Sequence, residues 1–248
     1  PPVDAAVAVV RGIQRRQRPH LHHTVALVCA ALAGFYRRLP GGHTAALRNC
    51  VLPRRGGGRG TGLARMKLWL VRHAQPLVDA GVCYGRLDVA ADPAATRASA
   101  QALAQALPLH AVLHTSPLQR CEHLAHTLCT LRPDLASKTD DRLAEMDFGS
   151  WEGQRWDALG AHALDAWTQD FAHHPPGGGE SVNHVMQRVA QALDSTRNSG
   201  QDTVWVTHAG VIRATRLLLA GQRQVQHAHE WPTEAVPFGA WEVHGLSR

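Results

Sequence analysis

Two histidines in this chain each follow directly after a short apolar run. The first run covers residues 68–72 and leads into His73, and the second covers residues 203–207 and leads into His208. Such a run followed by a polar residue is typical of a buried parallel strand, and ligands collect at the carboxyl ends of these strands. We therefore expect both histidines to face one crevice. Because a neutral imidazole beside a cation such as Arg72 can attack phosphorus, the pairing indicates phosphoryl transfer.

Either histidine alone is more typical of a hydrogen-bonded structural residue, since short patterns often match by chance. Two histidines in matching contexts reverse that judgement, and further motifs occur in order at residues 70–74, 115–121, 143–153, 176–181 and 206–213. These segments resemble, in turn, the Arg-His-Gly, Ser-Pro-Leu-x-Arg-Ala, Leu-x-Glu-x-x-x-Gly-x-Trp-Glu-Gly, Gly-Glu-Ser and second-histidine motifs of the histidine phosphatase superfamily, which includes the cofactor-dependent phosphoglycerate mutases. The resemblance spans about residues 66 to 244, and ordered motifs are more specific than any single one.

The resemblance and the chemistry of the residues imply the same roles. His73 is expected to attack phosphorus and carry the phosphoryl group covalently. Arg72 and Arg120 are expected to clamp phosphate oxygens; the alternatives are a surface salt bridge for Arg72 and an exposed helix position for Arg120. His208 would add a donor, and backbone N–H groups at Ala209, where a helix begins, would bind anionic oxygen. Cationic neighbours also lower the pKa of His73, which keeps this nucleophile unprotonated at neutral pH.

A leaving alkoxide must gain a proton, and the attacking water must lose one. One carboxyl group can do both in succession if its pKa lies near the working pH, and we expect Glu145 to take this part. Its rivals are Asp147 on the same loop and Glu152, which the family pattern suggests is structural near a helix start. Glu180 also begins a predicted helix, where we expect it to interact with the helix dipole rather than to act in catalysis.

The sequence departs from the mutase pattern beside the first histidine. Ala74 replaces the usual Gly, Pro76 the usual Ser or Thr, and Asp79 stands where the mutases have a substrate-binding Asn. The mutases also carry a longer substrate-covering insert between the residues that correspond to Glu145 and His208. These departures favour a phosphatase over a mutase.

Substrate choice depends on the loops around the site. Residues 82–89 and the Arg120-Cys121 pair resemble the α-ribazole phosphatases, which remove the 5′-phosphate of α-ribazole phosphate in cobalamin biosynthesis. We expect Gln75, Tyr84 and Arg86 to bind substrate, while Tyr84 and Arg86 have an equal claim to ordering their loop. A phosphatase for sugar phosphates, or one of broad range, would have the same catalytic residues and stays open. The complete set of His, Arg and Glu disfavours a non-enzymatic module that binds phosphate or nucleic acid.

Strands that alternate with helices must position these residues. The expected strands after the first cover residues 111–115, 203–207 and 240–243, and the expected helices cover residues 93–107, 118–131, 151–170, 181–196 and 211–219. Asp92 and Pro93 supply a capping acid and a proline at the first helical position. This alternation predicts an α/β fold, with a mostly parallel central sheet and helices on both faces, as in phosphoglycerate mutases.

The charge of the chain divides it at about residue 66. The whole chain has a formal net charge of +6, but residues 1–65 hold eleven arginines, no lysine and one acid, so this segment carries +10 and the remainder −4. The first segment is rich in Arg, Gly and Pro and has little apolar content to pack. We expect residues 1–65 to be a low-complexity basic extension outside the fold, and residues 66–248 to form a histidine phosphatase domain.

Composition also bears on partners. The most apolar stretch, residues 24–36, is shorter than the roughly 18 to 20 residues that cross a bilayer. Nucleic-acid binding is not expected of the folded part, because its arginines are dispersed and those in the motifs are the ones that a single phosphate would need. The five cysteines include no C-x-x-C pair, and the 17 histidines form no usual zinc ligand set, which argues against a disulfide framework and a metal site. We expect a cytoplasmic enzyme that acts on a small phosphate ester without a cofactor, in an oligomeric state that the sequence leaves open.

Overall fold

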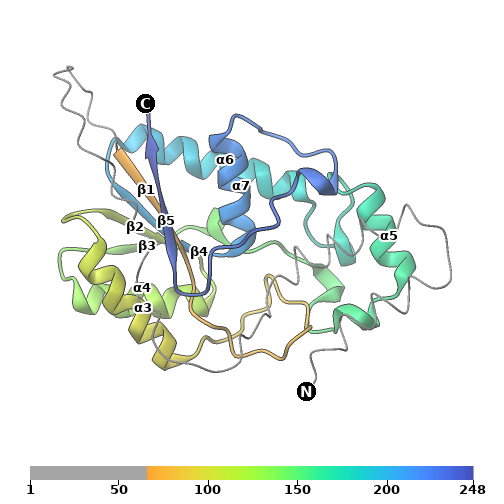
Figure 1. Cartoon of the computed structure of the whole chain (residues 1–248), viewed down its shortest axis with the longest axis horizontal. Coiled ribbons are helices and arrows are strands. Elements are labelled where there is room, and N and C mark those ends of the chain that lie inside the picture. The colour runs from red at the N-terminus through yellow and green to blue at the C-terminus, as the bar shows by residue number, and fades with distance from the viewer. Residues whose placement is uncertain (1–65, 248) are drawn as a thin grey trace.

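One five-stranded sheet lies at the centre of the computed structural model, which describes residues 66–247; the expected basic extension lies outside the described residues. The strands are Met66–Arg72 (β1), Val112–Thr115 (β2), Ser137–Thr139 (β3), Thr203–Thr207 (β4) and Trp241–Leu246 (β5). Their order in the sheet is β3-β2-β4-β1-β5, and only the edge strand β5 runs antiparallel to its neighbour (Figure 1). The mostly parallel α/β sheet expected from the sequence is confirmed.

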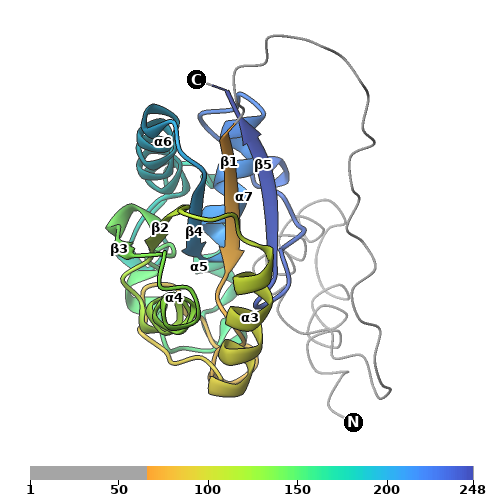
Figure 2. The same ribbon diagram turned by 90° about the vertical axis from the view of Figure 1, so that its left-hand side faces the viewer.

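The α-helices lie on both faces of this sheet. They are Pro93–Ala106 (α3), Gln119–Leu131 (α4), Ala161–Gln169 (α5), Val182–Ser199 (α6) and Ala209–Leu219 (α7). In the view of Figure 2, α3 and α4 lie together on one side, and α6 and α7 pack against each other away from them. The capping acid acts as expected, because the side chain of Asp92 accepts a hydrogen bond from the backbone N–H of Ala95 at the start of α3. The side chain of Ser181 accepts that of His184 at the start of α6.

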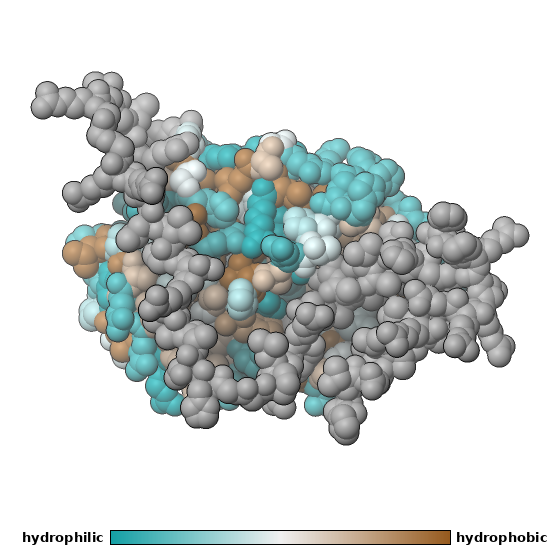
Figure 3. All heavy atoms as spheres, viewed as in Figure 1, coloured by the Kyte–Doolittle hydropathy of each residue, from teal (hydrophilic) through white to brown (hydrophobic). Residues whose placement is uncertain are grey.

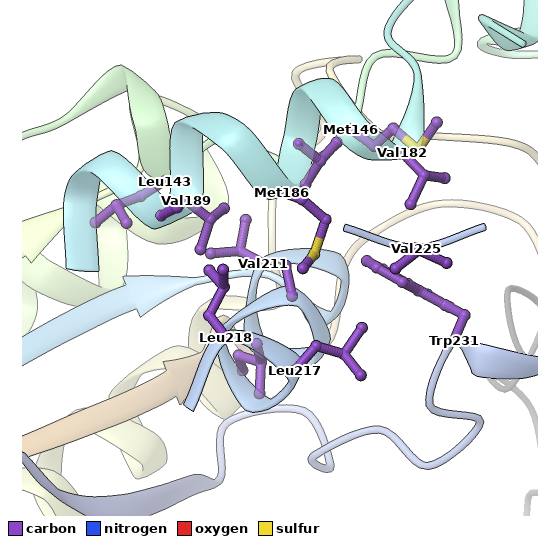
Figure 4. Close-up of a cluster of buried hydrophobic side chains, with 14 of the residues drawn as sticks. Leu143, Met146, Val182, Met186, Val189, Val211, Leu217, Leu218, Val225 and Trp231 are labelled. Carbon is purple, nitrogen blue, oxygen red and sulfur yellow. The ribbon is translucent and has the colours of Figure 1, made fainter. Parts of the chain in front are cut away.

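Each face of the sheet has its own hydrophobic core. Side chains alternate along a strand, so Leu68 and Leu70 join the core beneath α6 and α7, whereas Trp69 and Val71 join the core beneath α3 and α4. Figure 4 shows the first core, where Met186 of α6 is directed toward α7. Met186 is fully buried, which is worth about 1.5–3 kcal/mol relative to exposure. Both faces of β1 are therefore anchored, and its carboxyl end is held in place.

The expectation of one helix over residues 151–170 was wrong in part. The segment forms two short 3₁₀ turns, Gly149–Trp151 and Trp156–Ala158, before α5 begins at Ala161. Gly153 and Gly160 have φ values of 80° and 75°, a conformation that interrupts a right-handed helix. Further 3₁₀ turns occur at Asp141–Leu143, Pro176–Gly178 and Ala228–Glu230, and β3, which is exposed and three residues long, was not expected from the sequence.

On the face seen in Figure 3, hydrophilic side chains are interspersed with hydrophobic ones. The large hydrophobic side chains that are exposed in the described part of the chain are Leu77, Leu87, Leu109, Leu131 and Val243. Across residues 66–247, no helix combines the length and the apolar character that crossing a membrane requires.

Candidate active site

The carboxyl ends of three neighbouring strands meet at the edge of the sheet where the histidines lie. In the parallel pair β1 and β4, Arg72 is opposite Thr207, so the next residues, His73 and His208, leave the sheet side by side. The centroids of their rings are 5.1 Å apart. Next to β4, β2 is followed by Ser116, whose Oγ lies 2.7 Å from Nε2 of His208. The register of the sheet thus places three polar side chains from distant parts of the chain in one cluster.

The ring of His73 is buried, and its surroundings hold it in one tautomer. Its Nδ1 lies 2.7 Å from the backbone oxygen of Ala74. Because a carbonyl oxygen can only accept, Nδ1 carries the proton and Nε2 keeps its lone pair. Burial, followed by the charges of Arg120 and Arg72, holds the pKa of His73 well below 6.5. The imidazole is therefore neutral at pH 7, which is the form that can act as a nucleophile.

Arg72 is buried beside this ring, which excludes the surface salt bridge considered for it. Its Nη1 donates to the backbone oxygen of Val236 at 2.8 Å, and its guanidinium lies 3.7 Å from the centroid of the Phe238 ring. Burial lowers the pKa of Arg72 to about 10. An anion bound here would oppose that effect, because an opposite charge favours the protonated guanidinium.

Arg120, in the first turn of α4, is fully buried, so the exposed helix position considered for it is wrong. Its Nη1 donates to the backbone oxygen of Leu87 at 2.9 Å, and its Nη2 to that of Gly85 at 2.6 Å. The guanidinium also lies over the ring of Tyr84, 5.5 Å from its centroid. Its Nε is buried with no hydrogen-bond partner among the described residues. Arg120 therefore orders the loop at residues 84–87 and brings a positive charge to both histidines.

Glu145 lies at the start of α7. Its Oε2 accepts the backbone N–H of Gly210, and its Oε1 accepts that of Met146, each at 3.0 Å. Gly210 and the buried Ala209 form the first turn of α7, so the carboxyl group lies within one helical turn of His208. Each carboxylate oxygen has a further lone pair, so these two bonds orient the group and leave it able to exchange a proton.

The two rival carboxylates, Asp147 and Glu152, hold backbone instead, and Glu180 holds a side chain. Asp147 accepts the N–H of Gly149 at 2.7 Å, which closes a turn. Glu152 accepts four backbone N–H groups, those of Gly85, Arg86, Leu87 and Phe148, at 2.6–3.0 Å. Glu180 pairs with Arg188 on α6 at 2.7 Å. These three carboxylates therefore stabilise the local structure of their own segments. Glu145 differs from them because its carboxyl group accepts an N–H group at the start of α7.

The three expected substrate-binding residues differ in their surroundings. The backbone oxygen of Gln75, a half-buried residue, accepts the N–H of Asp92 at 2.7 Å, and this bond ties the loop after His73 to the start of α3. Tyr84 is also half-buried, beneath Arg120. The Arg86 side chain is exposed on a loop whose backbone is held by Glu152. The structure thus places Tyr84 against Arg120 and leaves Arg86 accessible from solution.

Two residues beside the histidines were not singled out from the sequence. Ser116 belongs to the segment at residues 115–121 that resembles a family motif, but its bond to His208 depends on β2 lying next to β4. Phe238 lies 5.5 Å from the ring of His73, measured between centroids, and precedes β5. The turn containing it is joined to β1, since the N–H of Gly239 donates to the backbone oxygen of His73 at 3.0 Å. No local pattern around Phe238 marks this long-range contact.

A family model described as histidine phosphatase superfamily (branch 1) matches residues 68–235, which is more than half of the chain. The chain belongs to the histidine phosphatase superfamily. The matched range contains both strand-end histidines, Arg72, Arg120 and Glu145, and the membership expected from the motifs is therefore confirmed.

Individual histidine phosphatases resemble this one over most of their length. A Hydrogenobacter thermophilus protein with the provisional name phosphoserine phosphatase 2 is 32% identical over 72% of this chain and 89% of its own. The adenosylcobalamin/α-ribazole phosphatase of Escherichia coli is 30% identical over 59% of this chain and 75% of its own. Among solved structures, a mycobacterial glucosyl-3-phosphoglycerate phosphatase is 26% identical with a TM-score of 0.59, and covers 72% of this chain and 89% of its own. This histidine phosphatase is accordingly a hydrolase of phosphate esters.

Within residues 66–247 of this histidine phosphatase, no three His, Cys, Asp or Glu side chains are grouped so that they could hold a metal ion. The positive charges of Arg120 and Arg72 act on His73.

Proposed function

We propose that this chain hydrolyses phosphate monoesters through a phosphohistidine formed on His73. The observation that carries the proposal is the bond from Nδ1 to the oxygen of Ala74, which leaves the lone pair on Nε2 of a buried, neutral imidazole. In the first step, Nε2 forms a bond to phosphorus while the bond between phosphorus and the ester oxygen breaks. Arg72, Arg120, His208 and the backbone N–H of Ala209 would bind the phosphoryl oxygens, and two guanidinium groups match the charge of a phosphate dianion.

Glu145 would move the protons of both steps. In its acid form it gives a proton to the leaving alkoxide, which departs as an alcohol. The resulting carboxylate then takes a proton from a water molecule, whose oxygen attacks phosphorus and breaks the bond to Nε2. Inorganic phosphate leaves, and both His73 and Glu145 return to their starting states. The two backbone N–H groups that hold the Glu145 carboxyl support this assignment, because a general acid or base must be positioned to be effective.

For the substrate, we propose the 5′-phosphate of α-ribazole phosphate. The loop at residues 82–89 and the Arg120-Cys121 pair resemble α-ribazole phosphatases, and the 30% identity to the Escherichia coli protein supports the assignment. Phosphoserine is the second candidate, because the Hydrogenobacter thermophilus relative is 32% identical over more of the chain. The exposed guanidinium of Arg86 could pair with the carboxylate of phosphoserine, which α-ribazole phosphate lacks, so the Arg86→Gln variant tests the second candidate. If phosphoserine is the substrate, this variant should lower kcat/KM for phosphoserine more than that for α-ribazole phosphate.

Two measurements test the proposal. Rapid quenching at alkaline pH during turnover should trap phosphate on His73, and His73→Ala should lose both the trapped phosphate and the turnover. A fully active His73→Ala variant, or phosphate trapped on another residue, would refute the covalent step. Phosphate release from α-ribazole phosphate, phosphoserine, glucosyl-3-phosphoglycerate and 3-phosphoglycerate ranks the substrates. A kcat/KM for phosphoserine that exceeds that for α-ribazole phosphate would replace the first substrate by the second.

A further inference from the structure

The segment that leads into Glu145 has three consecutive backbone oxygens held by side chains. Nη1 of Arg188 donates to the oxygens of Arg142 and Ala144, each at 2.7 Å. Between them, the hydroxyl of Thr207 donates to the oxygen of Leu143 at 2.7 Å. Thr207 directly precedes His208, so the segment before the carboxyl group is attached to the strand that carries the second histidine.

Arg188 is itself held by Glu180, one residue before the cap of α6. Its Nε and Nη2 bind the two carboxylate oxygens at 2.7 and 2.9 Å, a forked geometry that fixes the plane of the guanidinium. The backbone N–H of Glu180 also donates to the oxygen of Asp147 at 2.8 Å. The side chain of Arg188 therefore binds the chain before Glu145, at Ala144, and the backbone of Glu180 binds it after Glu145, at Asp147.

The Glu180–Arg188 pair is largely enclosed, and Arg188 lies on α6, which packs into the core. Both side chains are mostly buried, with exposed fractions of 16% for Arg188 and 18% for Glu180. Met186 and Val189, close to Arg188 on the same helix, are fully buried in the core shared with α7. Since α7 begins beside Glu145, one packed pair of helices supports both the carboxyl group and the backbone N–H of Gly210 that it accepts.

We propose that Glu180 and Arg188 are positioning residues for the Glu145 carboxyl group, an inference that rests on the proposed function of Glu145. Neither side chain needs to touch the substrate. Their effect is geometric, because a displacement of about 1 Å in a catalytic group can cost roughly 100-fold in rate. Lysine at position 188 keeps the positive charge but cannot form the fork to Glu180 together with the bonds to two backbone oxygens.

The chain offers a matched control in Arg132. Its guanidinium pairs with Asp134 at 2.7 Å and donates to the backbone oxygens of Ala104 and Leu107, each at 3.0 Å. The exposed fractions of Arg132 and Asp134, 13% and 18%, match those of the first pair. Arg132 lies at the end of α4, away from the carboxyl ends of the strands. Arg132→Lys therefore removes the same kind of interaction without altering the site.

The test compares kcat/KM for two esters, α-ribazole 5′-phosphate and 4-nitrophenyl phosphate, in the full chain. Nitrophenolate leaves without protonation, so a misplaced acid affects it little, whereas an alkoxide needs the proton. We expect Arg188→Lys to lower kcat/KM for α-ribazole 5′-phosphate, the alkyl ester, about 10- to 100-fold. The decrease in kcat/KM for the nitrophenyl ester should be much smaller. Arg132→Lys should lower the unfolding temperature by about as much as Arg188→Lys does. It should leave the ratio of kcat/KM for the two esters unchanged.

Equal losses on both esters in Arg188→Lys, or no loss, would overturn the positioning role. The Glu145→Gln variant tests the acid role of Glu145 separately from the positioning role of Arg188. If Glu145 is the acid, this variant should show a selective loss of kcat/KM on the alkyl ester whether or not Arg188 positions it. If Glu145→Gln shows no selective loss, the acid is misassigned and the positioning role falls with it. If Arg188→Lys fails to fold by circular dichroism, Glu180→Gln replaces it, and an unchanged ratio in that variant would again refute the inference.

Discussion

Gly210→Ala should disable the proposed acid without changing any group that takes part in the chemistry. A Cβ atom built on Gly210 would lie far inside 3.0 Å from Oε1 of Glu145, a separation that real Cβ atoms essentially never show. Gly210 lies within α7, and its φ is not in the left-handed region, so the backbone itself can accept alanine. The nearest atoms belong to the end of the Glu145 side chain, and the carboxyl group has to move.

The size of the effect follows from this geometry. Ordinary van der Waals contact with a Cβ atom begins at 3.4 Å, so the oxygen must shift by about 1 Å, a displacement that costs roughly 100-fold in catalysis. A helix interior gains about 0.5–1 kcal/mol when alanine replaces glycine, and Gly210, in the first turn of α7, gains at most that amount. The displaced carboxyl group also loses part of its hydrogen bonding to the N–H groups of Met146 and Gly210, about 1 kcal/mol each. We therefore expect a folded protein of nearly unchanged stability and much lower kcat/KM on an alkyl phosphate.

A double-mutant cycle isolates the cause. In the Glu145→Ala background the clashing carboxyl group is absent, so adding Gly210→Ala should have no further effect on kcat/KM, although each substitution alone is damaging. Thermal unfolding of all four proteins controls for folding. A Gly210→Ala variant with the parental kcat/KM would show that the reaction does not depend on where the Glu145 carboxyl group lies. A loss that persists in the Glu145→Ala background would place the effect outside the carboxyl group.

Four further outcomes are expected. Glu145→Gln should slow hydrolysis of α-ribazole phosphate by roughly 10²- to 10⁴-fold, and an equal defect with a nitrophenyl ester in kcat/KM would contradict its role as the acid. Exhaustive chelation should leave the rate unchanged, and a loss that one divalent metal restores would refute this. A chain that starts at Met66 should fold and keep its activity; insolubility of that chain would show that residues 1–65 belong to the fold. Burial, followed by the charge of Arg120, holds the pKa of His208 well below 6.5, so the unfolded chain binds the proton first and stability falls as pH drops below 6.5. His208→Gln should reduce that slope by up to about 1.4 kcal/mol per pH unit in urea titrations, and an unchanged slope would mean that His208 is not the titrating group.

The strands that carry the histidines were predictable because they are buried on both faces. β1 and β4 therefore appear as nearly continuous apolar runs with a polar residue at the end. β3 has three exposed residues, and so it has no apolar pattern that could distinguish it from a loop. The prediction of one helix over residues 151–170 was wrong in part for a different reason. Apolar side chains recur there at helical spacing, but the positive φ of Gly153 and Gly160 prevents a single helix, and glycine is compatible with several conformations.

The residues proposed to react could be named from the sequence, whereas those that hold them could not. His73 and Glu145 lie in short motifs whose chemistry is local. Arg188 acts on backbone oxygens more than forty positions earlier in the chain, and Phe238 reaches Arg72 only because β5 returns antiparallel to β1. Backbone oxygens are the same at every residue, so contacts made through them leave no signature of residue type.

Those unpredicted contacts also explain how two buried guanidinium groups can lie beside neutral histidines. Burying a charge without partners costs several kcal/mol, but Arg72 has the oxygen of Val236 and the face of Phe238, and Arg120 has the oxygens of Gly85 and Leu87. Backbone oxygens and aromatic rings carry partial negative charge, so they hold the guanidinium groups without neutralising them. The charges of Arg120 and Arg72 both lower the pKa of His73, and a phosphate dianion would meet the same two charges on binding.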